Sequence, residues 1–185
     1  MISNTFEADL HKMIDGDKIY TSRPLKVGLP SDMLSQCGAD PTKIITITKK
    51  VIDKAMRPEL RDESGRMIGN TGHGLSEVEI VLAVRELDMP TFIFMGRKDN
   101  SILAVTEIKD RKDRNIVVAI KFHHMEAFVE VNSIRSIYGR DNIGKFIGEN
   151  IDKGNLLAIH KKKADDLLRS IGKSYPKENT SISYD

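Results

Sequence analysis

Apolar residues in positions 1–90 recur mostly at the three- to four-residue spacing of amphipathic helices. The clearest case covers residues 77–88, where Ser76 and Glu79 form a capping box at the start and Pro90 ends the pattern. Shorter helices are predicted within residues 1–20, from Ser31 to about Gly38, and over residues 49–58. The β-branched run at 43–48 predicts a strand, and residues 24–30 are expected to be extended.

From residue 91 the pattern changes to strands, predicted at 91–95, 101–108, 115–123 and 127–138 with short polar connectors. A helix from Asn142 to Lys153, capped by Asp141, is expected to precede a strand at 155–160 and a last helix that ends at Gly172. Helices followed by an antiparallel meander indicate an α+β fold, with N-terminal helices packed on a sheet of four to five strands. The other face of that sheet would be free to form a site.

The length of 185 residues fits a single domain, which we expect to cover residues 24–185 behind a helical extension or linker at 1–23. The start has no signal-peptide pattern, and no apolar run is long enough for a membrane span. Cys37 is the only cysteine, so a reducing compartment such as the cytoplasm is expected.

The formal net charge of +2 is unevenly distributed along the chain. Residues 1–90 carry 12 Lys and Arg against 14 Asp and Glu, whereas residues 91–185 carry 17 against 13. A weakly positive C-terminal half is compatible with a polyanionic partner but not with a histone-like binder. Aromatic residues make up only 5%, which leaves few stacking platforms for single-stranded bases.

The strand at 115–123 carries the first candidate site. Its alternation places bulky residues on one face and Val117, Ala119, Lys121 and His123 on the other. Small side chains that lead to a lysine and a histidine would form a shallow floor for a phosphodiester. In the alternative interpretation, Lys121 only extends its stem over the end of the strand.

The next strand ends with a hydroxyl, a phenol and two guanidinium groups, from Arg135, Ser136, Tyr138 and Arg140. Arginine binds phosphate in a bidentate way and stays charged, so this group could hold a phosphate and donate a proton. If the strand is straight, Ser136 and Tyr138 share one face and Arg135 lies on the other. An ordinary surface arginine and a half-buried tyrosine are the alternative.

His73 lies between Gly72 and Gly74, just before the helix predicted at 77–88. An imidazole beside free helix N–H groups suits an anion site, and histidine is the usual general acid or base near neutral pH. A histidine that only serves the turn is the alternative.

Lys162 belongs to the densest basic run, which could neutralise phosphate or simply be solvated. The histidines lack zinc-site spacing, so no metal is expected. The glycine motifs G-x-x-x-x-G-K-[ST] and G-x-G-x-x-G are missing as well, and no cofactor is expected.

The order of these segments resembles a known family. The most telling pieces are the strand that ends Ser136-Ile137-Tyr138 and the LLAIHKK run at 156–162. Over residues 24–185 the chain is similar to the C-terminal toxin domain of phage minor head proteins of the MuF type. These domains form the phage branch of the barnase–EndoU–colicin–RelE-like nuclease superfamily. The resemblance therefore implies a barnase/EndoU/RelE-like version of the α+β fold.

The resemblance also implies a metal-independent endoribonuclease toxin that cleaves RNA, with tRNA as one candidate, by attack of a 2′-OH on the adjacent phosphorus. Such a protein would act in the cytoplasm of a bacterium after delivery by a phage or a secretion system. Its partners would be RNA and an immunity protein, with no membrane. Two alternatives stay open: a non-catalytic phage structural or RNA/protein-binding module, and an ADP-ribosyltransferase-like toxin, although no Glu-x-Glu follows a late strand.

The roles that follow from the resemblance are those of an acid–base ribonuclease. His73 would be the base or acid, and Lys121 would stabilise charge on the phosphorane. Arg135 or Arg140 would hold phosphate, and Tyr138 with Ser136 would orient the leaving group. Further substrate contacts would come from Arg140, His123 and Lys162, and from Ser181 and Ser183 if the tail folds back.

Overall fold

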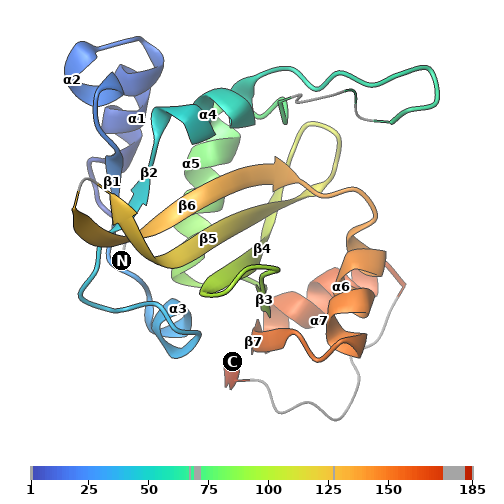
Figure 1. The fold of residues 1–185 in the computed structure, drawn as a ribbon. Helices are drawn as coiled ribbons and strands as arrows, with labels where there is room; N and C mark the ends of the chain where they lie inside the picture. The colour runs from blue at the N-terminus through green and yellow to red at the C-terminus, as the bar shows by residue number, and fades with distance from the viewer. Residues whose placement is uncertain (1, 67, 69–71, 127, 173–181, 185) are drawn as a thin grey trace.

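A mixed eight-stranded sheet forms the centre of the protein (Figure 1), in a computed structural model that describes residues 2–66, 68, 72–126, 128–172 and 182–184. The strand order is β1 (Leu25–Gly28), β2 (Ile45–Ile47), β6 (Val129–Gly139), β5 (Asn115–Glu126), β4 (Ser101–Lys109), β3 (Phe92–Met95), β7 (Leu156–His160) and β8 (Ile182–Tyr184). β2 pairs with β6 and β7 with β8 in parallel, and the other neighbours are antiparallel.

The α+β class is confirmed, but the predicted size of four to five antiparallel strands is wrong. Short strands at both edges extend the central meander, and two of them run parallel to their neighbours. A three-residue strand such as β2 or β8 joins a sheet through backbone hydrogen bonds, so its pairing leaves no periodicity in the sequence.

Helices cover both faces of the sheet. One face packs against α1 (Phe6–Ile14), α3 (Asp32–Gln36), α4 (Lys49–Met56) and α5 (Glu77–Arg85), and a short helix α2 (Lys18–Thr21) lies beside α1. The other face packs against α6 (Ile143–Asp152) and α7 (Lys161–Ser170). The expectation of one free sheet face is therefore wrong, because these C-terminal helices return over it and leave only part of it uncovered.

The alternation in β5 is confirmed by the two hydrophobic cores. Ile116, Val118 and Ile120 are buried in the core under α5, whereas Val117 is buried in the second core with Phe146. Both faces of the strand are thus apolar near its start, as in a strand covered on both sides. The second face opens to solvent only farther along, beyond Ala119.

The amphipathic pattern of the first helix is also confirmed, since Phe6, Leu10 and Met13 are buried in the same core as the sheet. The backbone N–H of Ser3 donates to the carbonyl of Val27 in β1 at 2.7 Å. The division of the chain after residue 23 stays a prediction.

Two predicted element ends differ from the structure. β5 continues through the expected turn at 123–126, with a bulge at His123, whose φ is 51°. Asp141 does not cap α6, because Asn142 occupies the cap position with φ 53° and no side-chain cap bond. The carboxylate of Asp141 instead accepts a hydrogen bond from Arg61 at 3.0 Å.

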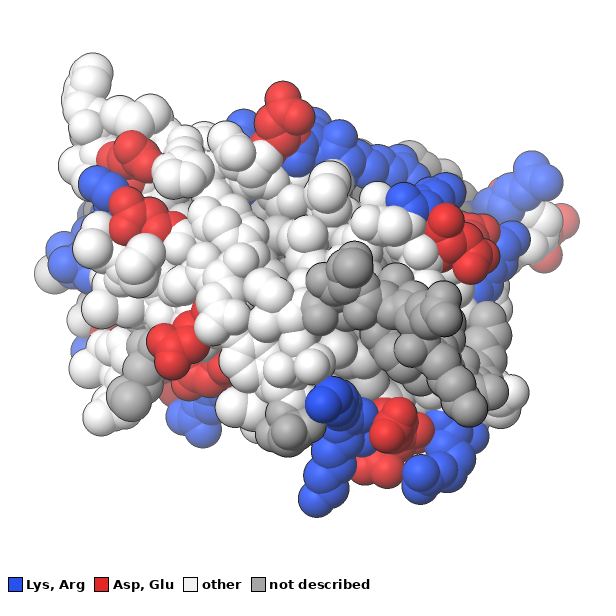
Figure 2. All heavy atoms as spheres, turned by 90° about the horizontal axis from the view of Figure 1, so that it is seen from below, with Lys and Arg blue, Asp and Glu red and all other residues white. Residues whose placement is uncertain are grey.

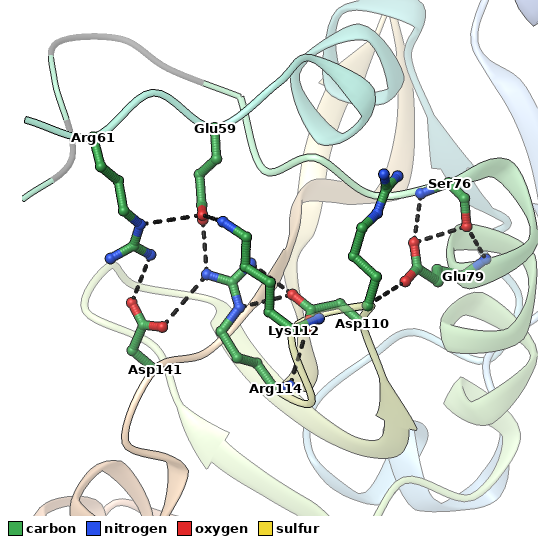
Figure 3. Close-up of polar contacts among 9 residues, drawn as sticks. Glu59, Arg61, Ser76, Glu79, Asp110, Lys112, Arg114 and Asp141 are labelled. Atoms are coloured by element: carbon green, nitrogen blue, oxygen red, sulfur yellow. Dashed lines mark hydrogen bonds and ion pairs between the residues drawn. The ribbon is translucent and has the colours of Figure 1, made fainter. Parts of the chain in front are cut away.

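A buried ionic cluster joins three separate segments of the chain (Figure 3). Arg114, at the start of β5, forms ion pairs with Asp110 at 2.6 Å and with Glu59 at 2.7 Å. Lys112 also pairs with Glu59, and Arg61 bridges Glu59 and Asp141. Since the side chains of Asp110, Glu59 and Arg114 are only 2%, 5% and 9% exposed, these charges depend on one another for solvation.

The cluster holds its central groups in the charged form. Burial alone would raise the pKa of Glu59, but hydrogen bonds from Lys112, Arg114 and Arg61 outweigh it and lower that pKa to about 2. Burial alone would lower the pKa of Arg114, and the hydrogen bonds to Asp110 and Glu59 raise it instead.

Charge is sparse on one side of the molecule. Seen from below the view of Figure 1, the middle of the surface is largely uncharged, and most Lys, Arg, Asp and Glu side chains lie toward its margins (Figure 2). Among the helices of the described residues, none combines the length and the apolar character that crossing a membrane requires.

We predict that Gly139→Ala destabilises the protein. A Cβ at this position would overlap the carboxylate of Asp110 and lie 2.9 Å from Nε of Arg114. The expected loss in the free energy of unfolding is about 1–3 kcal/mol, measured by urea denaturation. In a double-mutant cycle with Asp110→Ala the added cost of the methyl group should largely disappear. A cost unchanged by removal of Asp110 would contradict the proposed overlap.

We also predict that Glu59→Gln changes the acid sensitivity of folding. Because its pKa falls from 4.5 to about 2 on folding, Glu59 contributes stability that is present above about pH 4.5 and is lost as the pH falls toward 2. The difference in unfolding free energy between the wild type and Glu59→Gln should be largest near neutral pH and shrink across this interval. The exposed Glu63→Gln, on the same loop, is the control and should follow the wild type. A difference that does not change with pH would contradict the assignment.

Candidate functional site

Two adjoining hollows open where α6 leaves the sheet uncovered. The small hollow, of about 440 Å³, is lined by His73, Glu59, Arg61, Arg114, Asp141 and Lys145 among others. The large hollow, of about 780 Å³, is lined by Lys121, His124, Arg135, Arg97, Lys98 and Lys153 among others. Tyr138, Arg140, Phe146 and Glu149 line both. Their sizes are those of small-molecule or nucleotide sites.

The large hollow is strongly positive. It is lined by six cationic side chains, Arg97, Lys98, Lys121, Arg135, Arg140 and Lys153, and by one carboxylate, Glu149. None of the six forms an ion pair with a carboxylate in the described part of the chain, and Glu149 itself lies 3.8 Å from Lys145. Unpaired cations around one concave surface attract polyanions such as nucleic-acid backbones.

Two irregularities in the β5–β6 pair determine which side chains line the large hollow. The register shifts between Lys121 and His124, so His124 faces the hollow whereas Nδ1 of His123 lies 2.5 Å from Oε1 of Glu130. Another shift, opposite Ala119 and Ile120, makes Arg135 an extra residue in β6. Arg135 therefore lines the same hollow as Tyr138, which differs from the straight strand considered above.

Arg135 is oriented by His124. Its Nη1 donates to Nε2 of His124 at 3.1 Å, and since a guanidinium has no acceptor, the imidazole nitrogen accepts. The remaining N–H groups of Arg135 are left for a ligand in the hollow.

His73 is fixed by the end of helix α4. Its backbone N–H donates to the carbonyl of Lys54 at 3.1 Å, and the next two N–H groups donate to the carbonyls of Arg57 and Ala55. Gly72 lies so close to Arg57 that a Cβ would overlap the Arg57 carbonyl oxygen. Because Gly72 has no side chain, this segment lies close enough to α4 for its N–H groups to donate to the free carbonyls at the end of that helix.

The ring of His73 faces Ser136 and Tyr138. Its Nε2 lies 3.5 Å from Oγ of Ser136, and the rings of His73 and Tyr138 are 5.6 Å apart. The pKa of His73 is lowered to about 4, mainly by burial. The positive charges of Lys54 and Arg114 also lower this pKa, and together they outweigh the carboxylate of Glu59, which raises it. The imidazole is therefore neutral near neutral pH and can accept a proton.

The capping box of α5 occupies the helix end beside which an anion site was predicted. Ser76 Oγ accepts from the N–H of Glu79, and the Glu79 carboxylate accepts from the N–H of Ser76 and of Arg111. Glu79 therefore places its own negative charge where an anion would bind, so His73 works with the sheet and not with the helix end.

Tyr138 and Arg140 lie at the junction of the two hollows. Burial raises the pKa of Tyr138 more than the charges of Arg140 and Arg97 lower it, so its phenol remains a proton donor. The guanidinium of Arg140 stacks over the Phe146 ring with Cζ 4.7 Å from the centroid. Its Nε is buried without a hydrogen-bond partner among the described residues, which leaves Arg140 available to an oxyanion.

The structure brings together several of the residues predicted from sequence. His73, Ser136, Tyr138 and Arg140 are grouped around the small hollow, and Lys121, Arg135, Tyr138 and Arg140 around the large one. Ser136 contacts His73 but lines neither hollow, and Lys162 and His123 are exposed elsewhere. Ser183 lies in β8, at the opposite edge of the sheet from β1, and Ser181 lies outside the described residues.

Three cationic residues and one histidine of the large hollow had no part in the sequence prediction: Arg97, Lys98, Lys153 and His124. Arg97 and Lys98 belong to a polar connector after β3, and Lys153 ends α6. In the sequence these three residues are distinguished only by a charge at a turn or a helix end, and charged residues are common at such positions. Within the described ranges, no three His, Cys, Asp or Glu side chains gather in a way that could hold a metal ion.

Comparison with known proteins gives one match. The family model of the phage MuF-C-terminal domain matches residues 66–166, just over half of the chain. The match includes His73, Lys121, Tyr138 and Arg140, and it is shorter than the 24–185 range of the resemblance described above. No curated protein and no solved structure matches. By this match, with residues 66–166 covering β3 to β7 and the whole lining of the large hollow, the chain belongs to the phage MuF-C-terminal domain family.

Proposed function

We propose that this domain is a metal-independent endoribonuclease, in which a 2′-OH of the RNA attacks the adjacent phosphorus and cleaves the chain. The main support is the large hollow with its unpaired cations, which adjoins a neutral histidine and a protonated tyrosine. Cations that bind the phosphate, a base and an acid are the three parts that this reaction needs.

In the proposed reaction the scissile phosphate lies against Arg140 and Tyr138, at the junction of the hollows. Nε2 of His73 takes the proton of the 2′-OH as the 2′-oxygen bonds to phosphorus. The bond from phosphorus to the 5′-oxygen breaks, and the Tyr138 phenol gives its proton to that oxygen. Lys121 and Arg135 stabilise the extra negative charge of the phosphorane. The products are a 2′,3′-cyclic phosphate and a 5′-hydroxyl, and water returns the proton from His73 to Tyr138.

The direct test is incubation of the purified protein with bulk RNA and tRNA in excess EDTA. We predict cleavage that leaves 2′,3′-cyclic phosphate ends, and a loss of roughly 10²-fold or more for Lys121→Ala with Tyr138→Phe. The control is Lys18→Ala, which is exposed outside both hollows and should keep the activity. Folding of each variant is checked by thermal unfolding.

Other outcomes favour the alternatives. RNA binding without cleavage would favour a non-catalytic module, and NAD-dependent modification of a protein would favour an ADP-ribosyltransferase. In the proposed function, expression in a bacterial host is toxic unless an immunity protein is present, and the double variant relieves the toxicity. A fully toxic double variant with normal unfolding would contradict the assigned roles.

A second prediction concerns pH and His73. Because its pKa is lowered to about 4, the base is available throughout the neutral range, and the rate should fall only as the pH drops through about 4. His73→Ala should slow cleavage by roughly 10²–10⁴-fold and remove this acidic limb. Rate–pH profiles of both proteins, measured where circular dichroism shows them folded, test this. A limb near pH 6.5 that survives in the variant would assign the base to another histidine.

A further inference from the structure

We propose that RNA lies across the two hollows in one fixed direction. The nucleoside whose 2′-OH attacks occupies the small hollow, and the nucleotides on the 3′ side of the cleaved bond, with their phosphates, occupy the large hollow. This inference rests on the proposed ribonuclease function and adds the polarity of the bound substrate.

The junction between the hollows fixes the position of the cleaved phosphate. Tyr138 and Arg140 line both hollows, so a phosphate held between them has open space on each side. Arg140 is held by stacking on Phe146 and has no ion-pair partner among the described residues, so its N–H groups are available to that phosphate.

The two hollows differ in free charge. The cations that line only the small hollow are paired with carboxylates: Arg61 and Arg114 pair with Glu59, Asp110 and Asp141, and Lys145 lies 3.8 Å from Glu149. The large hollow has five more cations besides Arg140, none of them ion-paired with a described carboxylate. Additional phosphates are therefore attracted to the large hollow and not to the small one.

The position of His73 determines which hollow holds the nucleoside before the cleaved bond and which holds the nucleotides after it. It lines only the small hollow, so the 2′-OH that it deprotonates belongs to a nucleoside on that side. The leaving 5′-oxygen then belongs to the chain that runs into the large hollow.

The experiment uses oligonucleotides with a single ribonucleotide among deoxynucleotides, so that only the bond after the ribonucleotide can be cleaved by 2′-OH attack. A core dinucleotide is compared with versions extended by two deoxynucleotides on the 3′ side or on the 5′ side. We predict that the 3′ extension raises kcat/KM by about 10-fold or more at low salt, and that the 5′ extension changes it by less than about 3-fold. The 3′ gain should decline steeply with added salt.

Two lysines of helix α6 provide matched variants. Lys153→Ala removes a cation that lines only the large hollow and should lower the gain from the 3′ extension several-fold. Lys145→Ala removes one that lines only the small hollow and should keep that gain. The ratio between extended and core substrates is compared within each variant, so a general loss of activity does not affect the result.

The outcomes separate the inference from the proposed function. Equal gains on both sides, or a larger gain on the 5′ side, would overturn the direction while the ribonuclease function stands. Cleavage of long RNA without cleavage of any of the short chimeras would overturn the two-hollow footprint. If the folded protein cleaves neither RNA nor chimeras, the proposed function fails and the inference fails with it.

Discussion

The burial of Arg114 between two carboxylates constrains much of this structure. Its guanidinium pairs with Asp110 from its own hairpin and with Glu59 from the loop after α4, and each of the three side chains is less than a tenth exposed. A buried charge without its partner is strongly destabilising, so the loop, the hairpin turn and the start of α6 must stay together. Gly139 contributes by lacking a side chain where the Asp110 carboxylate lies.

The site is built on irregular backbone supported by that constraint. Bulges in β5 and β6 turn His124 and Arg135 into the large hollow, and a glycine allows the His73 segment to close the end of α4. The result is a concentration of unpaired cations beside residues whose charges are fully paired. This contrast is what distinguishes the two hollows, and it comes from neighbouring parts of one sheet face.

The sequence predicted the regular parts of the fold well. The capping box of α5, the strands β3 to β7 and the buried face of α1 all follow from local patterns that the structure keeps. The full extent of the sheet could not be predicted, because β1, β2 and β8 join it through long-range backbone pairing.

For the candidate site, sequence reasoning selected the strand ends and His73, and several of those residues do meet. The sequence could not show that His124, and not His123, faces the large hollow. A single bulge exchanges the two faces of the strand for the residues that follow it. The low pKa of His73 comes mainly from burial, which exists only once the chain has folded, and further from the charges of Lys54 and Arg114, which are distant in sequence.

The position of His73 also bears on where this domain can be divided. The family match begins at residue 66, yet the carbonyls that hold His73 belong to α4, and Glu59, which neutralises Arg114, precedes the match as well. A fragment cut at the family boundary would lose much of the first core and one of the two buried carboxylates that pair with Arg114. The segment by which the family is recognised is thus smaller than the unit that folds.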